Sequence, residues 1–191
     1  LDVPGEDKFR GKGVSYCGTC DGALFKNKKV VVVGGGDTAL EETLFLTRFA
    51  KKVTVIHRRN ALRGTKILQE RAFANKKIEF AWDSVVTEIV GAGKVTGVKI
   101  KNVKTNAISD LLCEGVFIFV GYTPNTAFLN GLLPLDESGY IISDDNCLTS
   151  KAGIFAAGDC RKKLLKQVVT ACGEGATAAF SCQRFLETRT S

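Results

Sequence analysis

Short runs of β-branched residues and helix-like apolar spacings alternate in the first part of the chain. Val30 to Val33 is a run of four valines ended by three glycines, which predicts a buried strand. From Asp37 to Ala50 apolar positions recur every three or four residues, which predicts a helix. Val53 to Ile56 predicts a second buried strand. A strand, helix and strand in this order favour a right-handed crossover and a parallel sheet.

After this unit the pattern predicts one more helix and then a series of strands. The helix covers Thr65 to Ala74 and is followed by a strand from Ile78 to Trp82. Glycine-containing or polar turns then separate three short apolar runs, which indicates an antiparallel meander before another apolar strand. The three runs are Val85 to Val90, Val95 to Asn102 and Ile108 to Leu112, and the last strand is Val116 to Val120.

The segment Gly121-Tyr122-Thr123-Pro124-Asn125 breaks this pattern, and we place a domain boundary there. Residues 1–122 and 123–191 are thus expected to form two domains. In the second, we expect short strands near Ile141 and at Ile154 to Ala156, then a helix from about Gln167 to Leu186. The fold class is α/β, with a Rossmann-like first domain that combines a parallel sheet and an antiparallel meander.

Composition narrows the class of protein. With 45% hydrophobic and 25% charged residues, the 191-residue chain is globular. No apolar run reaches the roughly 18 residues of a membrane helix, so we expect no membrane partner and a cytoplasmic location. The net charge of +7 comes from short clusters without a basic stripe interleaved with aromatic residues, so we expect no nucleic-acid partner.

A glycine-rich turn lies between the first predicted strand and helix. The sequence GGGDTA supplies Gly34, Gly36 and Ala39 at the spacing of a dinucleotide-binding turn, and it also contains Asp37 and Thr38. Gly34 permits the tight turn, Gly36 lets the backbone approach a pyrophosphate, and Ala39 lets helix and strand pack closely. The ligand phosphates would then meet the positive end of the helix dipole.

The second predicted strand ends in basic residues where such units normally carry an acidic one. That acidic residue binds the ribose hydroxyls, whereas here the strand ends in His57, Arg58 and Arg59, with Arg63 one turn further on. Guanidinium groups bind a 2′-phosphate through charge-assisted hydrogen bonds. The cluster therefore predicts a preference for NADP(H) over NAD(H). His57 is the only histidine, so hydrolases that need a catalytic histidine elsewhere are disfavoured.

The sequence YCGTCDG places Cys17 and Cys20 two residues apart, which suits a redox dithiol, half of a zinc site or an ordinary turn. Zinc would need further ligands at defined spacing, and the remaining five cysteines are scattered singly. A redox dithiol fits better, and Asp21 could carry the proton that its chemistry requires. Because a disulfide accepts hydride poorly from NADPH, a flavin between the two is expected.

Several motifs together resemble a known family. GVSYCGTCDG, VVVVGGGDTALEE, VTVIHRR with Arg63, GYTPNT and GIFAAGDCRKKLLKQVVTACGEGATAA occur in this order across essentially the whole chain. In this they resemble the low-molecular-weight, NADPH-dependent thioredoxin reductases of bacteria and plants. The resemblance implies a thioredoxin-disulfide reductase in which electrons pass from NADPH through FAD to the disulfide and on to thioredoxin, in a homodimer.

The resemblance also assigns roles to individual residues. Cys17 and Cys20 would form the redox disulfide, and Asp21 would be the acid or base. Two further groups would bind cofactors. The NADPH group comprises Gly34, Gly36, Asp37, Thr38, Ala39, His57, Arg58, Arg59 and Arg63; Gly121, Gly158, Asp159, Lys166 and Gln167 complete the cofactor-binding set, with Gly158, Asp159 and Gln167 toward FAD. No metal site is expected.

Two departures from the family pattern bear on function. Lys166 stands where the family usually has arginine, and the chain holds one glycine-rich turn where family members have two. The chain is therefore expected to be a C-terminal piece, namely the NADPH domain and the C-terminal half of the FAD domain, which by itself lacks bound flavin and turns over poorly. Two alternatives stay open: the flavoprotein subunit that reduces alkyl hydroperoxide peroxidase, or an incomplete NADP(H)-binding module.

Overall fold

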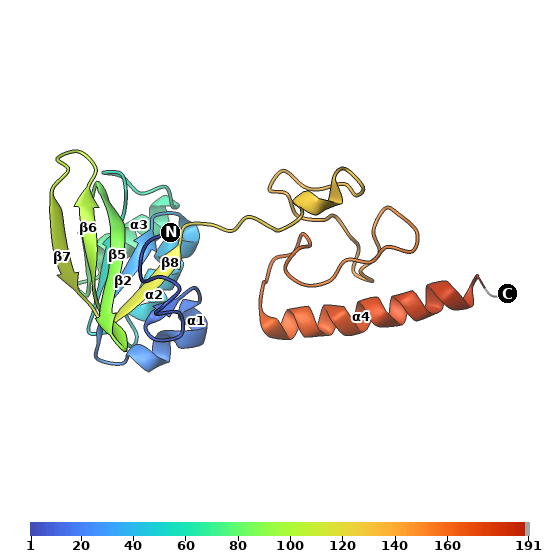
Figure 1. Cartoon of the computed structure of the whole chain (residues 1–191), viewed down its shortest axis with the longest axis horizontal. Coiled ribbons are helices and arrows are strands. Elements are labelled where there is room, and N and C mark those ends of the chain that lie inside the picture. The colour runs from blue at the N-terminus through green and yellow to red at the C-terminus, as the bar shows by residue number, and fades with distance from the viewer. Residues whose placement is uncertain (190–191) are drawn as a thin grey trace. The chain divides into compact units, whose positions relative to one another are not determined.

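The computed structural model describes residues 1–189 and divides the chain into two compact units (Figure 1). The first unit is Leu1–Gly121 and the second is Tyr122–Ser191. The first combines sheets with flanking helices, whereas the second consists mostly of loops and one long helix. Which cofactor each unit binds stays a prediction.

A five-stranded parallel sheet forms the centre of the first unit. Its strand order is β1-β8-β2-β3-β4, and every neighbouring pair is parallel. The strands are β1 (Val14–Ser15), β2 (Lys29–Gly34), β3 (Lys52–Ile56), β4 (Ile78–Ala81) and β8 (Gly115–Phe119). Strands β2 and β8 contribute buried side chains to a core on each face of the sheet, which is why they are continuous apolar runs.

The alternation of side chains along β2 connects the two cores of this unit. Val30 and Val32 point to the face where helix α2 (Asp37–Leu46) packs through Leu40 and Leu46. Val31 and Val33 belong to the opposite core, which contains residues of the antiparallel sheet. All four valines are buried, so β2 packs against the core on each face of the parallel sheet.

The antiparallel meander has the order β5-β6-β7. Its strands are β5 (Ser84–Ala92), β6 (Lys94–Asn102) and β7 (Ile108–Leu112). The buried side chains Ile89, Val95 and Val98 pack with Val116 and Ile118 of the parallel sheet. The prediction of an α/β fold with a parallel sheet and an antiparallel meander is confirmed.

Three short elements in the glycine-rich opening of the chain were not predicted. They are β1, helix α1 (Gly18–Asp21) and the 3₁₀ helix η1 (Gly22–Phe25). Each is too short to produce a hydrophobic period, so no pattern indicates it. Helix α3 (Lys66–Ala74) completes the first unit within the range predicted for it.

The second unit has a small core. Its regular elements are the 3₁₀ helix η2 (Ala127–Leu129) and helix α4 (Val168–Glu187), the latter close to its predicted range. The strands expected near Ile141 and at Ile154 to Ala156 are wrong, because the chain makes only isolated bridges there. Ile141 and Ala156 instead pack with Leu133 in a cluster of three buried residues, so burial and not strand pairing explains their apolar character.

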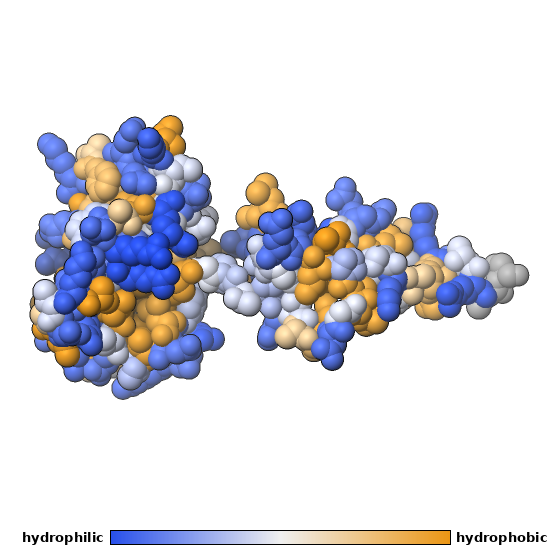
Figure 2. Space-filling view, turned by 90° about the horizontal axis from the view of Figure 1, so that it is seen from above, coloured by the Kyte–Doolittle hydropathy of each residue, from blue (hydrophilic) through white to orange (hydrophobic). Residues whose placement is uncertain are grey.

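The surface of the second unit reflects this small core. No residue of α4 is buried, and Val168 and Val169 are largely exposed. Figure 2 shows apolar residues among polar ones on the visible face of this unit. Among residues 1–189, none of the helices is long and apolar enough to cross a membrane.

Candidate functional site

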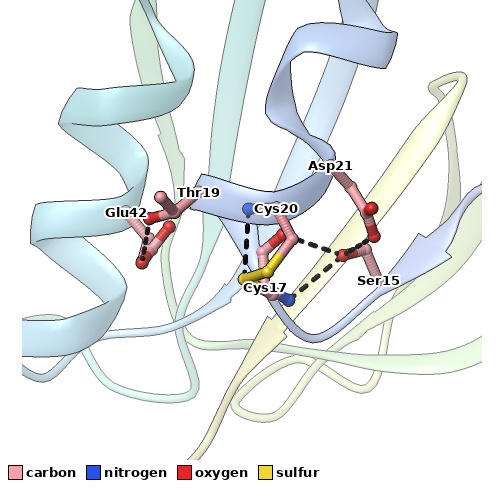
Figure 3. The surroundings of a disulfide bond; sticks show 6 residues. All are labelled: Ser15, Cys17, Thr19, Cys20, Asp21 and Glu42. Atoms are coloured by element: carbon pink, nitrogen blue, oxygen red, sulfur yellow. Dashed lines mark hydrogen bonds between the residues drawn. A yellow bond between two sulfur atoms is a disulfide. The ribbon is translucent and has the colours of Figure 1, made fainter. Parts of the chain in front are cut away.

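Cys17 and Cys20 are joined by a disulfide at the start of α1 (Figure 3). Cys17 is the N-cap of this helix and has an extended backbone, and its Sγ accepts a hydrogen bond of 3.1 Å from the Cys20 backbone N–H. The helical turn brings the two Cα atoms within 5.3 Å of each other. Of the three uses that the spacing allows, this disulfide fits the redox pair. Within residues 1–189, no group of three or more His, Cys, Asp or Glu side chains is placed to hold a metal ion.

Ser15 connects the disulfide to the predicted proton carrier. Its hydroxyl donates a 2.7 Å hydrogen bond to Oδ2 of Asp21 and accepts one of 3.1 Å from the Cys17 backbone N–H. Ser15 is buried on strand β1, whereas Asp21 is partly exposed at the end of α1. The carboxylate is therefore held beside the dithiol at a fixed place and keeps access to solvent.

The glycine turn joins β2 to α2 with little room to spare on one side. Gly34 has φ +154°, and a Cβ placed on it would lie 2.7 Å from the Cβ of Ala39 and 2.5 Å from the carbonyl oxygen of Phe119. Gly34 therefore has to be glycine for the helix and two strands to pack closely. A Cβ on Gly36 would meet nothing nearer than a guanidinium nitrogen of Arg63 at 3.8 Å. The backbone at Gly36 thus faces open space that a ligand can enter.

The first turn of α2 is open to an anion. Its N-cap is Gly36, which has no side chain with which to cap the first backbone N–H groups. Thr38 is exposed beside them. The carboxylate of Asp37 accepts a 2.7 Å hydrogen bond from the Thr65 backbone N–H, so it holds the following loop against the turn. Free N–H groups at a helix start suit a phosphate.

The predicted arginine cluster lies at the same turn. Arg58, Arg59 and Arg63 are exposed and border a cleft of about 320 Å³ that Gly34 and Gly35 also line. Within the part of the chain that the structure describes, none of the three forms an ion pair with a carboxylate. Their charges are therefore available to an anionic ligand in the cleft.

His57 packs between this loop and the glycine turn. It is 6% exposed, its Nε2 lies 3.1 Å from the carbonyl oxygen of Ala61, and its ring packs on Gly35 so closely that any Cβ there would overlap it. Burial lowers the pKa of His57, with smaller contributions from the charges of Arg63 and Arg58, although hydrogen bonds to the backbone oppose the shift. The imidazole is therefore neutral at pH 7 and does not add to the cationic charge.

The remaining predicted residues lie outside these two clusters. Gly121 ends the first unit with φ +105°. In the second unit Gly158 has φ +83° and donates its N–H to Glu174 at 2.7 Å, and Asp159 pairs with Lys163 at 3.3 Å. Gln167 forms a capping box with Thr170 at the start of α4.

A cleft of the second unit brings some of these residues together. Asp159 and Lys166 line it with Tyr122 and Tyr140, and the Lys166 ammonium lies 4.1 Å from the centre of the Tyr140 ring. The Asp159 side chain is 60% exposed, so its carboxylate can reach a ligand. Most predicted residues thus lie at the disulfide, at the glycine turn or in this cleft, whereas Gly121, Gly158 and Gln167 do not line either cleft.

Two residues of these sites were missed from the sequence. Ser15 precedes the cysteine motif and contacts it only because β1 pairs beside the loop. Gly35 was treated as a spacer, yet it supplies the surface on which the His57 ring rests. A search for small polar residues flanking a Cys-x-x-Cys motif would have found Ser15, whereas the role of Gly35 depends on contact across two strands.

Three comparisons with known proteins find similar disulfide reductases. Residues 1–175 match the profile of the family described as pyridine nucleotide-disulphide oxidoreductase. Curated relatives include thioredoxin reductases from Rickettsia conorii, 53% identical over 97% of the chain and 61% of the relative, and from Peptoclostridium litorale, 49% identical over 96% and 60%. A crystal structure of thioredoxin reductase from Streptococcus pyogenes is 53% identical with a TM-score of 0.92, covering 98% of the chain and 62% of that structure. The chain spans about 60% of the length of the curated relatives it matches.

Proposed function

The chain belongs to the pyridine nucleotide-disulphide oxidoreductase family, and from this premise we propose that it carries the nucleotide-binding and disulfide chemistry of an NADPH-dependent thioredoxin reductase. The observation that carries the proposal is the Cys17–Cys20 disulfide, which stands in the same compact unit as the glycine turn. The turn precedes α2, and α1 packs against α2. Both sites are thus built on neighbouring elements.

NADPH is the nucleotide that the first unit fits best. The open backbone at Gly36 and the uncapped start of α2 suit the pyrophosphate. The exposed guanidinium groups of Arg58, Arg59 and Arg63 suit a 2′-phosphate, which carries the charge that distinguishes NADPH from NADH. The neutral, buried His57 would hold the loop that presents these arginines.

FAD is the second cofactor of the proposal. The cleft of the second unit fits part of such a group, because its lining offers an exposed carboxylate on Asp159, a cation on Lys166 and aromatic rings. The resemblance adds Gly158 and Gln167 to this set. When bound, a flavin would supply the chemistry that links the oxidation of NADPH to the reduction of a disulfide. The chain's own residues there hold and orient the group.

Thiol-disulfide exchange would transfer the electrons to thioredoxin. One sulfur of the reduced Cys17 and Cys20 pair attacks the disulfide of thioredoxin, which forms a mixed disulfide and frees one thioredoxin thiol. The other sulfur of the pair then attacks the first, breaks the mixed disulfide and releases the second thioredoxin thiol, so the pair is oxidised and thioredoxin is reduced. Asp21, oriented by Ser15, is placed to give or take the protons that accompany these steps.

The relatives favour thioredoxin over the peroxidase partner. Those named above are thioredoxin reductases, and the arginine cluster suits NADPH, whereas the peroxidase-reducing flavoproteins typically favour NADH. A homodimer and a cytoplasmic location belong to the same proposal. The five unpaired cysteines among residues 1–189 support a reducing compartment.

A trapping experiment tests the proposed partner. We would prepare Cys17→Ser and Cys20→Ser variants and mix each with a thioredoxin whose single active-site cysteine carries a thionitrobenzoate leaving group. One of the two variants is expected to release the coloured thiolate and form a covalent one-to-one complex, because its remaining sulfur is the one that attacks thioredoxin. Peptide mapping identifies that sulfur.

The control is the Cys17→Ser, Cys20→Ser double variant, which keeps the five scattered cysteines. It is expected to release the leaving group only slowly and without a defined complex. If the double variant reacted as fast as the single ones, or if the complex formed through the exposed Cys172, the proposed exchange with thioredoxin would be wrong.

A further inference from the structure

Glu42 of α2 contacts both residues that lie between the two cysteines (Figure 3). The Thr19 hydroxyl donates a 3.2 Å hydrogen bond to its Oε1. Its Oε2 lies against Gly18 so closely that a Cβ on that glycine would overlap it. Figure 3 shows Glu42 reaching the loop from one side, while Ser15 and Asp21 lie on the other.

The second contact is made at an energetic cost. Oε2 of Glu42 is buried and has no hydrogen-bond partner among the described residues. Leaving a buried polar atom unpaired is unfavourable, and more so for a charged group. Such an atom in a native structure calls for an explanation. Here it is the close fit between Glu42 and Gly18, which fixes the path of the loop through the middle of the dithiol motif.

We propose that Glu42 is a positioning residue for the dithiol, which sets how readily the Cys17–Cys20 disulfide is reduced. When that bond breaks, the covalent constraint on the loop is lost, but the contacts of Glu42 with Gly18 and Thr19 remain. They keep the loop wound as in α1, so the two sulfurs stay near one another. Two groups held in place react as if at high local concentration, which favours the disulfide.

The equilibrium with glutathione measures this effect directly. Two glutathione thiols are oxidised to glutathione disulfide, while the disulfide of the chain accepts two electrons and two protons and becomes the Cys17 and Cys20 thiols. The inference rests on the redox role of the pair in the proposed function. The measurement uses neither nucleotide, flavin nor thioredoxin, so its failure is distinguishable from failure of the trapping experiment.

Glu42→Ala in the whole chain is expected to make the disulfide about three to ten times easier to reduce, or roughly 15 to 30 mV. Thr19→Val, which removes only the hydroxyl, should shift the equilibrium in the same direction by a smaller factor. Gly18→Ala should shift the equilibrium as far as Glu42→Ala, because the added methyl group displaces the carboxylate. The double variant should shift it no further than either single variant. Circular dichroism confirms that each variant is folded.

Two comparisons separate positioning from charge. Glu42→Gln keeps an oxygen that can accept from Thr19 and is expected to stay within about twofold of the parent equilibrium. Glu41→Ala, on the adjacent exposed residue of α2, serves as the matched control and should change nothing. The inference is overturned if Glu42→Gln shifts the equilibrium as far as Glu42→Ala, or if Thr19→Val and Gly18→Ala both leave it unchanged.

Discussion

Single arginines decide nucleotide choice in the proposed function. Arg58, Arg59 and Arg63 are exposed around the cleft and form no ion pair within residues 1–189, so their charges are not neutralised by the fold. A buried imidazole keeps their loop on the glycine turn without contributing charge. The distinction between NADPH and NADH is therefore expected to depend on these side chains.

Replacing Arg58 and Arg59 by glutamine tests this directly. A hydrogen bond to a charged group contributes about 1.5 to 3 kcal/mol, so NADPH should bind roughly ten to a hundred times more weakly, whereas NADH should change by less than about twofold. Fluorescence titration of the whole chain measures both nucleotides. Arg71→Gln, an exposed arginine of α3, is the control and should affect neither. Equal losses for NADPH and NADH would remove the 2′-phosphate from the role of these arginines.

At the scale of elements, the turn between β2 and α2 contains one glycine that packs against its neighbours and one that is open to a ligand. Two glycines of the same turn face different surroundings: Gly34 is enclosed by Ala39 and Phe119, while Gly36 faces open space. We expect the fold to require the first and the proposed nucleotide to require the second. Substituting each in turn should therefore produce different losses.

Gly34→Ala is expected to lower the free energy of unfolding of the first unit by roughly 2 to 4 kcal/mol, because the methyl group collides with Phe119 of β8 and Ala39 of α2. Gly36→Ala should change it by no more than about 0.5 kcal/mol, since its φ of −91° suits any residue and its surroundings are open. Even so, Gly36→Ala should weaken NADPH about tenfold or more, because the methyl group occupies the path of the pyrophosphate. Urea unfolding and nucleotide titration give the two quantities. A stable Gly34→Ala variant, or undiminished binding by Gly36→Ala, would contradict this division.

The same elements show how far the sequence predicts the fold. The runs at Val30 and Val53 are continuous and β-branched, the spacing after Asp37 repeats over several helical turns, and the sheet and α2 formed where expected. Helix α1 has four residues and no period, so nothing marks it in advance. The apolar residues near Ile141 suggested strands because the sequence shows that a residue is buried but not which neighbour buries it.

For the whole molecule, the sequence points to the cysteine pair and the glycine turn but not to the contacts that other elements make with them. The cysteine pair and the glycine turn stand out because their spacing is short and local. Ser15, Gly35 and Glu42 act across elements, through strand pairing or helix packing, and spacing does not reveal such contacts. Assigning the first unit to NADPH and the second to FAD remains a proposal that binding to the chain must test.

The central claim is that the Cys17–Cys20 pair passes electrons to thioredoxin. The most direct test reduces the chain, removes the reductant, adds an excess of oxidised thioredoxin, and labels all thiols for mass spectrometry. We predict that Cys17 and Cys20 together lose their labels while thioredoxin gains two, and that neither Cys17→Ser nor Cys20→Ser completes this transfer. The claim would be contradicted if Cys17 and Cys20 stayed labelled while thioredoxin remained oxidised, although dithiothreitol reduced the same thioredoxin.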